Sequence, residues 1–132
     1  MKRDMDLVRE ILLALEKHPT TVSNPEELGL EAADKDELWH NFNILEDAGF
    51  ITFTIIRSWR GGGFVREEYE TKGPYRLTWQ GHEFIDTIRD PELWSKTKAG
   101  ADAVKSWSIE TLKEIGKGLI KKQIEEYTGV KF

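Results

Sequence analysis

The sequence contains no cysteine. Disulfide bonds, zinc sites with thiolate ligands, iron–sulfur clusters and thiol nucleophiles are therefore all excluded. A chain of 132 residues does not need such a staple, because folding at this size buries roughly two-thirds of the unfolded surface. The length predicts one domain rather than two domains with separate cores.

Long hydrophobic runs are also missing. No apolar stretch approaches the ~20 residues of a membrane-spanning helix, and the opening Met1-Lys2-Arg3-Asp4 lacks the apolar segment of a signal peptide. We therefore expect a cytoplasmic protein with no membrane partner.

Catalytic motifs are scarce as well. No Gly-x-Ser-x-Gly elbow is present, and no Gly-Lys-Ser/Thr follows Gly61-Gly62-Gly63. His82-Glu83 begins like a zinc-protease motif, but Asp86 stands where the second histidine is needed. The sequence thus predicts a protein that is not an enzyme and that binds no metal or cofactor.

Helical periodicity is present in the first half of the chain. Apolar residues at helical spacing predict a helix from Asp4 to about Lys17, ended by His18-Pro19. A loop and at most two helical turns follow over residues 20–33. Asp34 and Glu37 fit a capping box that starts a helix running to Ala48. On this helix Leu38, Phe42 and Leu45 share one face, and the opposite face carries Asp36, His40, Asn43 and Asp47.

The period changes from 3.6 to 2 after Gly49, where we expect the helix to end and Phe50 to fold back onto Leu45. Strand-forming residues from Phe50 to Ser58 and from Phe64 to about Thr71 predict a β-hairpin. Its tip is expected at Trp59 to Gly63. Lys72-Gly73-Pro74 predicts that the second strand is bulged or divided before Tyr75.

The C-terminal part is predicted to be helical. Thr78 is expected to cap a helix through Arg89, and Pro91 restarts a short helix that fades near Gly100. A linker of small residues at 99–103 then leads to Ser108, the expected cap of a last helix over 109–127. This helix either packs back on the domain or forms a homodimer contact. Close approach of another element would explain its Gly116 and Gly118.

The order of these elements is typical of a winged helix-turn-helix protein. We therefore predict an α+β fold with a β-hairpin wing at 1–90 and a C-terminal helical extension at 91–132, packed on the same domain. Two phrases favour this interpretation. Leu45 to Ile51 resembles the passage from a recognition helix into a wing, and Leu77 to Gly81 resembles the exit from the second wing strand.

Three stretches carry a closer resemblance: Met1 to Arg9, the phrase Leu77-Thr78-Trp79-Gln80-Gly81-His82-Glu83-Phe84-Ile85-Asp86, and Ile88-Arg89-Asp90 with Trp94. They are similar to a domain-of-unknown-function family, numbered 2513, that is found in phages, prophages and bacteria. The resemblance spans nearly the whole chain. It implies a mobile-element context and a winged-helix-like fold, and it brings no catalytic residues.

Charge is distributed unevenly around a net value of −5. Residues 34–49 hold five acids and one base, whereas residues 50–66 hold three arginines and no acid. The negative charge of this helix opposes binding in a DNA groove, although the Asn43 side chain can hydrogen-bond to adenine and His40 can contact a phosphate. The wing is the better candidate for double-stranded DNA, with Trp59 placed to stack on a base and with phosphate ligands at Arg57, Arg60 and Arg66.

A second interpretation uses the same wing. Tryptophan and arginine are enriched at the hot spots of protein interfaces, so Trp59 and the wing arginines suit a host or defence protein as partner. A third, purely structural interpretation packs Trp59 under the hairpin and leaves the arginines to solubilise an edge strand. The leading hypothesis is DNA binding or transcription regulation through the wing, and the alternative is a protein-interaction module such as a phage-encoded inhibitor.

Overall fold

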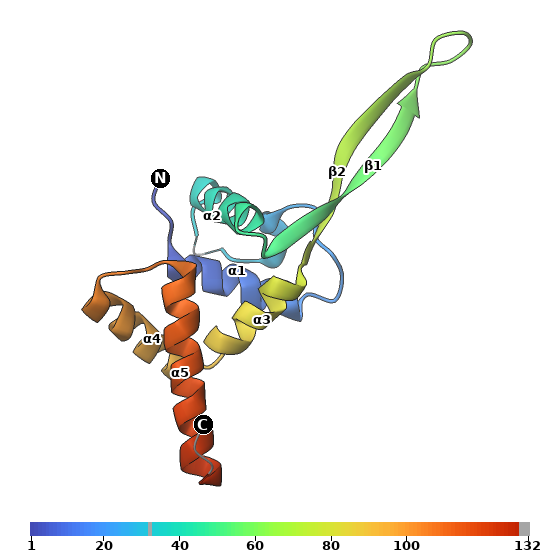
Figure 1. Cartoon of the computed structure of the whole chain (residues 1–132). Coiled ribbons are helices and arrows are strands. Elements are labelled where there is room, and N and C mark those ends of the chain that lie inside the picture. The colour runs from blue at the N-terminus through green and yellow to red at the C-terminus, as the bar shows by residue number, and fades with distance from the viewer. Residues whose placement is uncertain (32, 130–132) are drawn as a thin grey trace. The chain divides into compact units, whose positions relative to one another are not determined.

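The computed structural model describes residues 1–31 and 33–129 (Figure 1). This part of the chain holds five α-helices, one 3-10 helix and a two-stranded antiparallel sheet, which confirms the predicted α+β class. Backbone contacts divide the chain into two compact units, Met1–His82 and Glu83–Phe132. The elements are α1 (Met5–Lys17), η1 (Pro25–Leu28), α2 (Lys35–Asp47), β1 (Ile51–Arg60), β2 (Glu67–Leu77), α3 (Trp79–Ile88), α4 (Pro91–Val104) and α5 (Ile109–Thr128).

Helix α1 starts and ends where the sequence predicts. The Asp4 carboxylate accepts hydrogen bonds from the backbone N–H groups of Asp6 and Leu7 at 3.1 and 3.2 Å, which satisfies two donors of the first turn. The chain leaves the helix at His18, in extended conformation before Pro19. The apolar stripe of α1 is buried and comprises Met5, Leu7, Val8, Ile11, Leu12 and Leu15.

The predicted short helix between residues 20 and 33 is η1, capped by the Asn24 side chain; Ala32, in the same stretch, lies outside the described residues. Helix α2 follows with Asp34 at its N-cap position. The predicted capping box is wrong, because the Asp34 side chain makes no cap hydrogen bond. An ion pair at 3.2 Å between Lys35 and Glu26 instead connects the first turn of α2 to η1.

The end of α2 agrees with its sequence signature. Gly49 adopts φ +80°, a left-handed conformation that glycine favours, and the Phe50 N–H donates to the Leu45 carbonyl at 3.0 Å. This turn directs the chain from the helix straight into β1, with Phe50 and Ile51 both buried.

Strands β1 and β2 form a hairpin that extends past the helices of its own unit (Figure 1). The predicted bulge is confirmed, because the register shifts between Phe53 and Ile55, opposite Gly73 and Pro74. The predicted tip is misplaced. Strand β1 continues to Arg60, past its expected end at Ser58, and β2 begins at Glu67 rather than at Phe64. Trp59 pairs with Glu68 inside the ladder, so the turn occupies residues 61–66.

Aromatic side chains connect the base of the hairpin to α2. The Tyr75 ring lies edge-on to Phe42, with centroids 4.7 Å apart, and 5.6 Å from Phe53. Tyr75 also forms a one-residue bridge to Val22 through two backbone hydrogen bonds. Leu38, Phe42 and Leu45 are buried as predicted, and the contact of Phe42 with Tyr75 fixes α2 against the base of the hairpin.

The second unit contains most of α3 together with α4 and α5. The predicted linker at 99–103 is wrong, because α4 continues through it to Val104. The reason is packing: a Cβ on Gly100 would lie 3.2 Å from Ile115, and Ala101 is fully buried. These small residues therefore form the surface on which α5 packs.

Helix α5 begins as predicted, with the Ser108 hydroxyl accepting from the Thr111 N–H at 3.1 Å. Gly116 allows the close approach that the sequence indicated, since a Cβ there would meet Thr87 at 3.2 Å, whereas Gly118 faces open space. Burial of its apolar stripe stops early: Leu112 is buried, but Ile124 and Tyr127 are exposed. The homodimer contact through this helix stays a prediction. Within the described residues, no helix is both long and apolar enough to cross a membrane.

Candidate binding surface

The part of the hairpin beyond the bulge, residues 55–72, is the most exposed element of the first unit, and we call it the outer hairpin. Six paired residues of β1 span about 20 Å at the usual rise of an extended strand. Because side chains alternate along a strand, Arg57, Trp59, Glu68 and Glu70 share one face. Arg60, Glu67 and Tyr69 share the other.

Acidic partners across the strands neutralise two of the predicted binding arginines. Arg57 lies 3.3 Å from Glu70, and Arg60 lies 3.0 Å from Glu67. All four side chains are more than half exposed, so the pairs contribute little to stability. The pairs instead reduce the positive potential of the hairpin, because Arg57 and Arg60 on β1 each have a glutamate directly opposite on β2.

Arg66 and Trp59 form a separate pair near the tip. The Arg66 guanidinium lies 5.5 Å from the centroid of the Trp59 ring, within cation–π range. Arg66 makes no ion pair among the described residues. Trp59 is 59% exposed, which rules out the interpretation that it packs under the hairpin. The structure thus places an exposed arginine–tryptophan pair near the tip of the hairpin.

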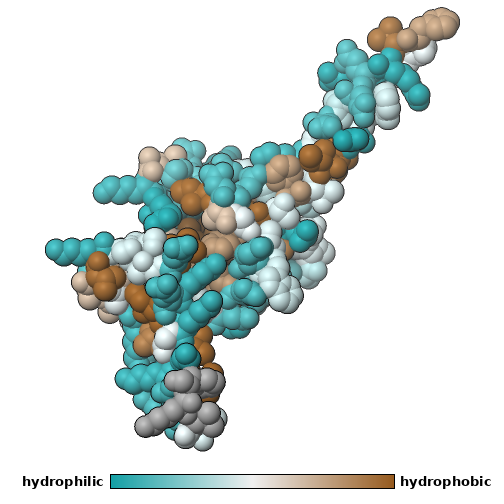
Figure 2. All heavy atoms as spheres, in the orientation of Figure 1, coloured by the Kyte–Doolittle hydropathy of each residue, from teal (hydrophilic) through white to brown (hydrophobic). Residues whose placement is uncertain are grey.

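Apolar side chains of the outer hairpin form a feature that sequence reasoning missed. Phe64 in the turn is fully exposed, and Val65 beside it is 67% exposed. Figure 2 shows hydrophobic residues at the far end of the hairpin. The sequence signal for this exposure was the position of Phe64 and Val65 directly after three glycines, at the tip of a hairpin, where side chains cannot pack into the core. The large exposed hydrophobic residues of the outer hairpin are Ile55, Ile56, Trp59, Phe64, Val65 and Tyr69.

The predicted residues of α2 lie apart from this group. Asn43 is exposed and His40 is half-buried, on the helix face that also carries Asp36 and Asp47. No hydrogen bond or ion pair joins either residue to a hairpin arginine within the described chain. The structure therefore does not gather the six predicted site residues into one cluster.

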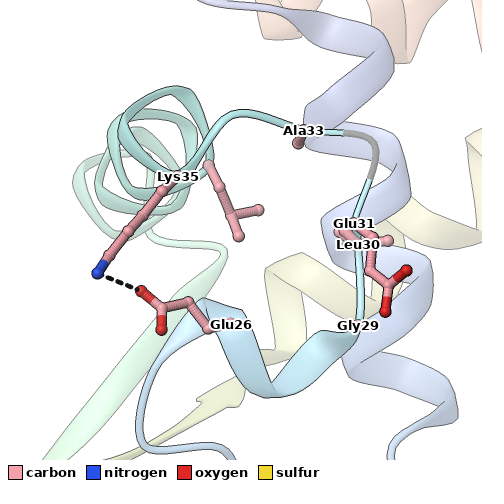
Figure 3. Close-up of a pocket in the computed structure, with 7 residues that line it drawn as sticks. Glu26, Gly29, Leu30, Glu31, Ala33 and Lys35 are labelled. Carbon is pink, nitrogen blue, oxygen red and sulfur yellow. Dashed lines mark ion pairs between the residues drawn. The ribbon is translucent and has the colours of Figure 1, made fainter.

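A depression between η1 and α2 is a second candidate site (Figure 3). It measures about 250 Å³, below the usual range of small-molecule pockets. The Lys35–Glu26 ion pair lies at its edge, and Glu26 also accepts a hydrogen bond from Trp39 Nε1 at 3.4 Å. These charged groups already bind one another, so the depression is explained by the contact between the two helices.

Metal ligation finds no geometric support in the described part of the chain, where no three histidine, aspartate or glutamate side chains lie close enough together to hold an ion.

Comparisons with known proteins agree with the resemblance in the sequence. The family model described as "Hypothetical protein (DUF2513)" matches residues 2–108, which include every element up to α4. An uncharacterized protein of Haemophilus influenzae is 28% identical over 128 residues, covering 94% of this chain and 99% of its own length. No solved structure matches this chain. Because the family model covers most of the sequence, the chain belongs to the DUF2513 family.

Proposed function

We propose that this protein is a non-enzymatic protein-binding module whose outer hairpin inserts into an apolar groove of a partner protein. The observation that carries the proposal is the contrast between charge and hydrophobicity on the outer hairpin. Arg57 and Arg60 are neutralised across the strands, while Phe64 and Val65 remain exposed at the end of the hairpin.

The chemistry of the partner follows from this contrast. The ion pairs across the strands leave the hairpin with little net charge to attract a polyanion. Transfer of its exposed aromatic side chains from water into an apolar groove, in contrast, lowers the free energy. Exposed apolar patches rimmed by polar groups are typical of protein interaction sites. Because the resemblance is to a phage- and prophage-associated family, a host or defence protein is the first partner to test.

Two matched variants test the proposal. Phe64→Ser removes the exposed side chain at the tip, whereas Tyr127→Ser removes an equally exposed aromatic residue from the end of α5. We expect a host protein that is captured by the wild type and by Tyr127→Ser, but lost with Phe64→Ser. The captured protein is then purified and titrated, and Phe64→Ser should weaken its Kd by at least about ten-fold. Equal affinity of both variants for every captured protein refutes the proposal.

DNA binding is the second candidate function, and a different observation favours it. The order α1, η1, α2 and hairpin, with Val22 adding a minimal third strand at Tyr75, resembles the order of elements in a winged helix-turn-helix protein. In this version the unit Met1–His82 is a winged helix, α2 is its recognition helix, and the tip pair Arg66 and Trp59 enters a groove.

The salt dependence of binding to random duplex DNA separates the two candidates. Among the described residues Arg66 is the only wing arginine that makes no ion pair. If it alone neutralises a phosphate, the slope of log K against log salt should be about −0.9. Fluorescence anisotropy at two salt concentrations, comparing the wild type with Arg66→Ala, measures it. The absence of binding at low salt, or binding that Arg66→Ala leaves unchanged, would exclude DNA binding through the wing.

A further inference from the structure

Each strand of the hairpin has one edge that faces away from the other strand. On β1 the backbone groups of this edge have no hydrogen-bond partner within the described residues, whereas on β2 some of them are paired. Tyr75 of β2 uses its backbone N–H and C=O to bond Val22, at 2.7 and 3.2 Å. Both groups therefore point away from β1. Residues opposite each other in an antiparallel pair either exchange both bonds or exchange none. Phe53, the partner of Tyr75, consequently has its own N–H and C=O directed to the far side of β1.

Backbone alternation extends this open edge along the strand. The bulge lies on β2, so β1 continues as a regular strand from Ile51 to Arg60. Ile55, Arg57 and Trp59 then direct their backbone groups outward as Phe53 does. Ile51 is buried, so the open edge begins at Phe53. Within the described residues, no hydrogen bond reaches the outward side of these positions. The edge is a row of unsatisfied donors and acceptors.

The two edges also differ in protection. Proteins block free strand edges with charges, prolines and bulges. Strand β2 has all three, in Glu70, Lys72 and the bulge at Gly73-Pro74, besides the bridge from Val22. The first six residues of β1, Ile-Thr-Phe-Thr-Ile-Ile, contain no charge, proline or glycine. Strand β1 thus presents the less protected edge.

We propose that this edge pairs with β1 of a second copy of the chain, antiparallel and centred on Ile55. Three pairs of outward-directed residues, Phe53 with Arg57, Ile55 with Ile55 and Arg57 with Phe53, then form about six backbone hydrogen bonds between the copies. Ile55 meets Ile55, and Thr54 meets Ile56 of the other copy. Ile55 and Ile56 are 53% and 44% exposed in the single chain, and pairing covers both.

Charge favours a second copy and selects the register. Centring on Arg57 would set two arginines opposite each other, whereas centring on Ile55 separates them by four residues along the strand, about 13 Å. The same register brings Arg60, which is paired with Glu67 in the single chain, beside Phe50 of the other copy, just past the end of α2. The last turn of α2 carries Glu46 and Asp47 and no basic residue, and a helix C-terminus attracts cations.

This pairing does not rest on the proposed function. Phe64 and Val65 lie beyond the paired segment, so strand pairing between the copies does not use them. Loss of self-pairing and loss of partner binding are therefore separable, because substitutions at the β1 edge address the first and Phe64→Ser addresses the second.

Engineered cysteines test the register directly, since the chain has none of its own. Thr52 lies opposite Ser58 of the second copy, in a non-hydrogen-bonded pair with Cα atoms about 4.5 Å apart, within disulfide range. Under mild oxidation we expect neither Thr52→Cys nor Ser58→Cys alone to form a covalent dimer, whereas a mixture of the two variants does. A mixture of Thr54→Cys with Ser58→Cys is the matched control and should not cross-link.

Light scattering after size exclusion gives the second measurement. The wild type should have the mass of a dimer over a wide range of concentration, and Ile55→Lys the mass of a monomer with unchanged circular dichroism, because two lysines would then face each other. A monomeric wild type overturns the proposal and leaves a foreign strand as the only occupant of the edge. A dimer that survives Ile55→Lys, or that lacks the Thr52–Ser58 cross-link, also overturns it and directs attention to α5.

Discussion

The side-chain hydroxyl of Thr78 donates a 2.6 Å hydrogen bond to the backbone carbonyl of Gly49. The same oxygen accepts from the Gly81 N–H at 3.1 Å, and the Thr78 N–H bonds the Phe50 carbonyl at 3.0 Å. Thr78 therefore connects three elements by hydrogen bonds: the end of α2, the base of β1 and the start of α3. This junction sets where the hairpin leaves the helices of the first unit.

Removing that hydroxyl should loosen the junction. Thr78→Val keeps the shape of the side chain but removes the hydroxyl, so the Gly81 N–H and the Gly49 carbonyl lose their hydrogen-bond partner. We expect the free energy of unfolding to fall by about 1–2 kcal/mol, measured by urea denaturation. Thr128→Val is the control: it removes a hydroxyl bond to Ile124 at the exposed end of α5, and should cost less than about 0.5 kcal/mol. Equal losses would contradict the role of Thr78.

Two helical glycines should respond oppositely to alanine. A Cβ on Gly81 would collide with the Phe50 backbone carbonyl, whereas a Cβ on Gly118 would meet nothing within 4 Å. Gly81→Ala should lower the free energy of unfolding by about 1–3 kcal/mol. Gly118→Ala should raise it by up to about 1 kcal/mol through helix propensity. Thermal unfolding of both variants measures the difference, and the same sign for both would be contrary to this structure.

Asn41 is a buried polar residue that holds the start of the chain. Its Oδ1 accepts from the Asp4 N–H at 2.8 Å, and its Nδ2 donates to the Glu37 carbonyl at 2.9 Å. Asn41→Ala should destabilise the protein by about 1–3 kcal/mol, because it leaves a cavity and an unpaired donor. Asn43→Ala, on the exposed face of the same helix, should stay within about 0.5 kcal/mol of the wild type. Chemical denaturation of both proteins distinguishes the two sites.

Glu67 and Glu70 of β2 should weaken nucleic-acid binding, because they neutralise the arginines opposite them. In Glu67→Gln with Glu70→Gln, the hairpin keeps its shape but Arg57 and Arg60 lose their anionic partners. If the wing reaches DNA, we expect tighter binding to duplex and a salt slope that steepens from about −0.9 to about −2.7. Anisotropy titrations at several salt concentrations measure the slope. An unchanged slope would show that these arginines do not meet phosphate even when released.

Local patterns predicted most of the helices. The caps of α1 and α5 were correct because a cap depends on a few neighbouring residues, and so was the Gly49 turn. The length of α4 was wrong for the opposite reason. Its small residues at 99–101 look like a linker in sequence, but in the fold they allow Ile115 to approach.

The candidate site shows the same division. The sequence predicts a basic, aromatic wing with binding residues at Arg57, Trp59, Arg60 and Arg66, because residues 50–66 hold no acid and the acids begin at Glu67. Only the register of the hairpin reveals that Arg60 faces Glu67 and that Arg57 faces Glu70. His40 and Asn43 share a helix face as predicted, but the fold does not bring them to the wing.

The sequence by itself determined the order of the elements, the hairpin, the bulge and the absence of thiol chemistry, because each depends on residue type or short spacing. The tertiary structure decided which charges cancel, which apolar residues stay exposed, and which strand edge is open. Those properties depend on residues brought together across a turn or between strands. A net charge of −5 therefore says less about the partner of this protein than the pairing of Arg57 with Glu70.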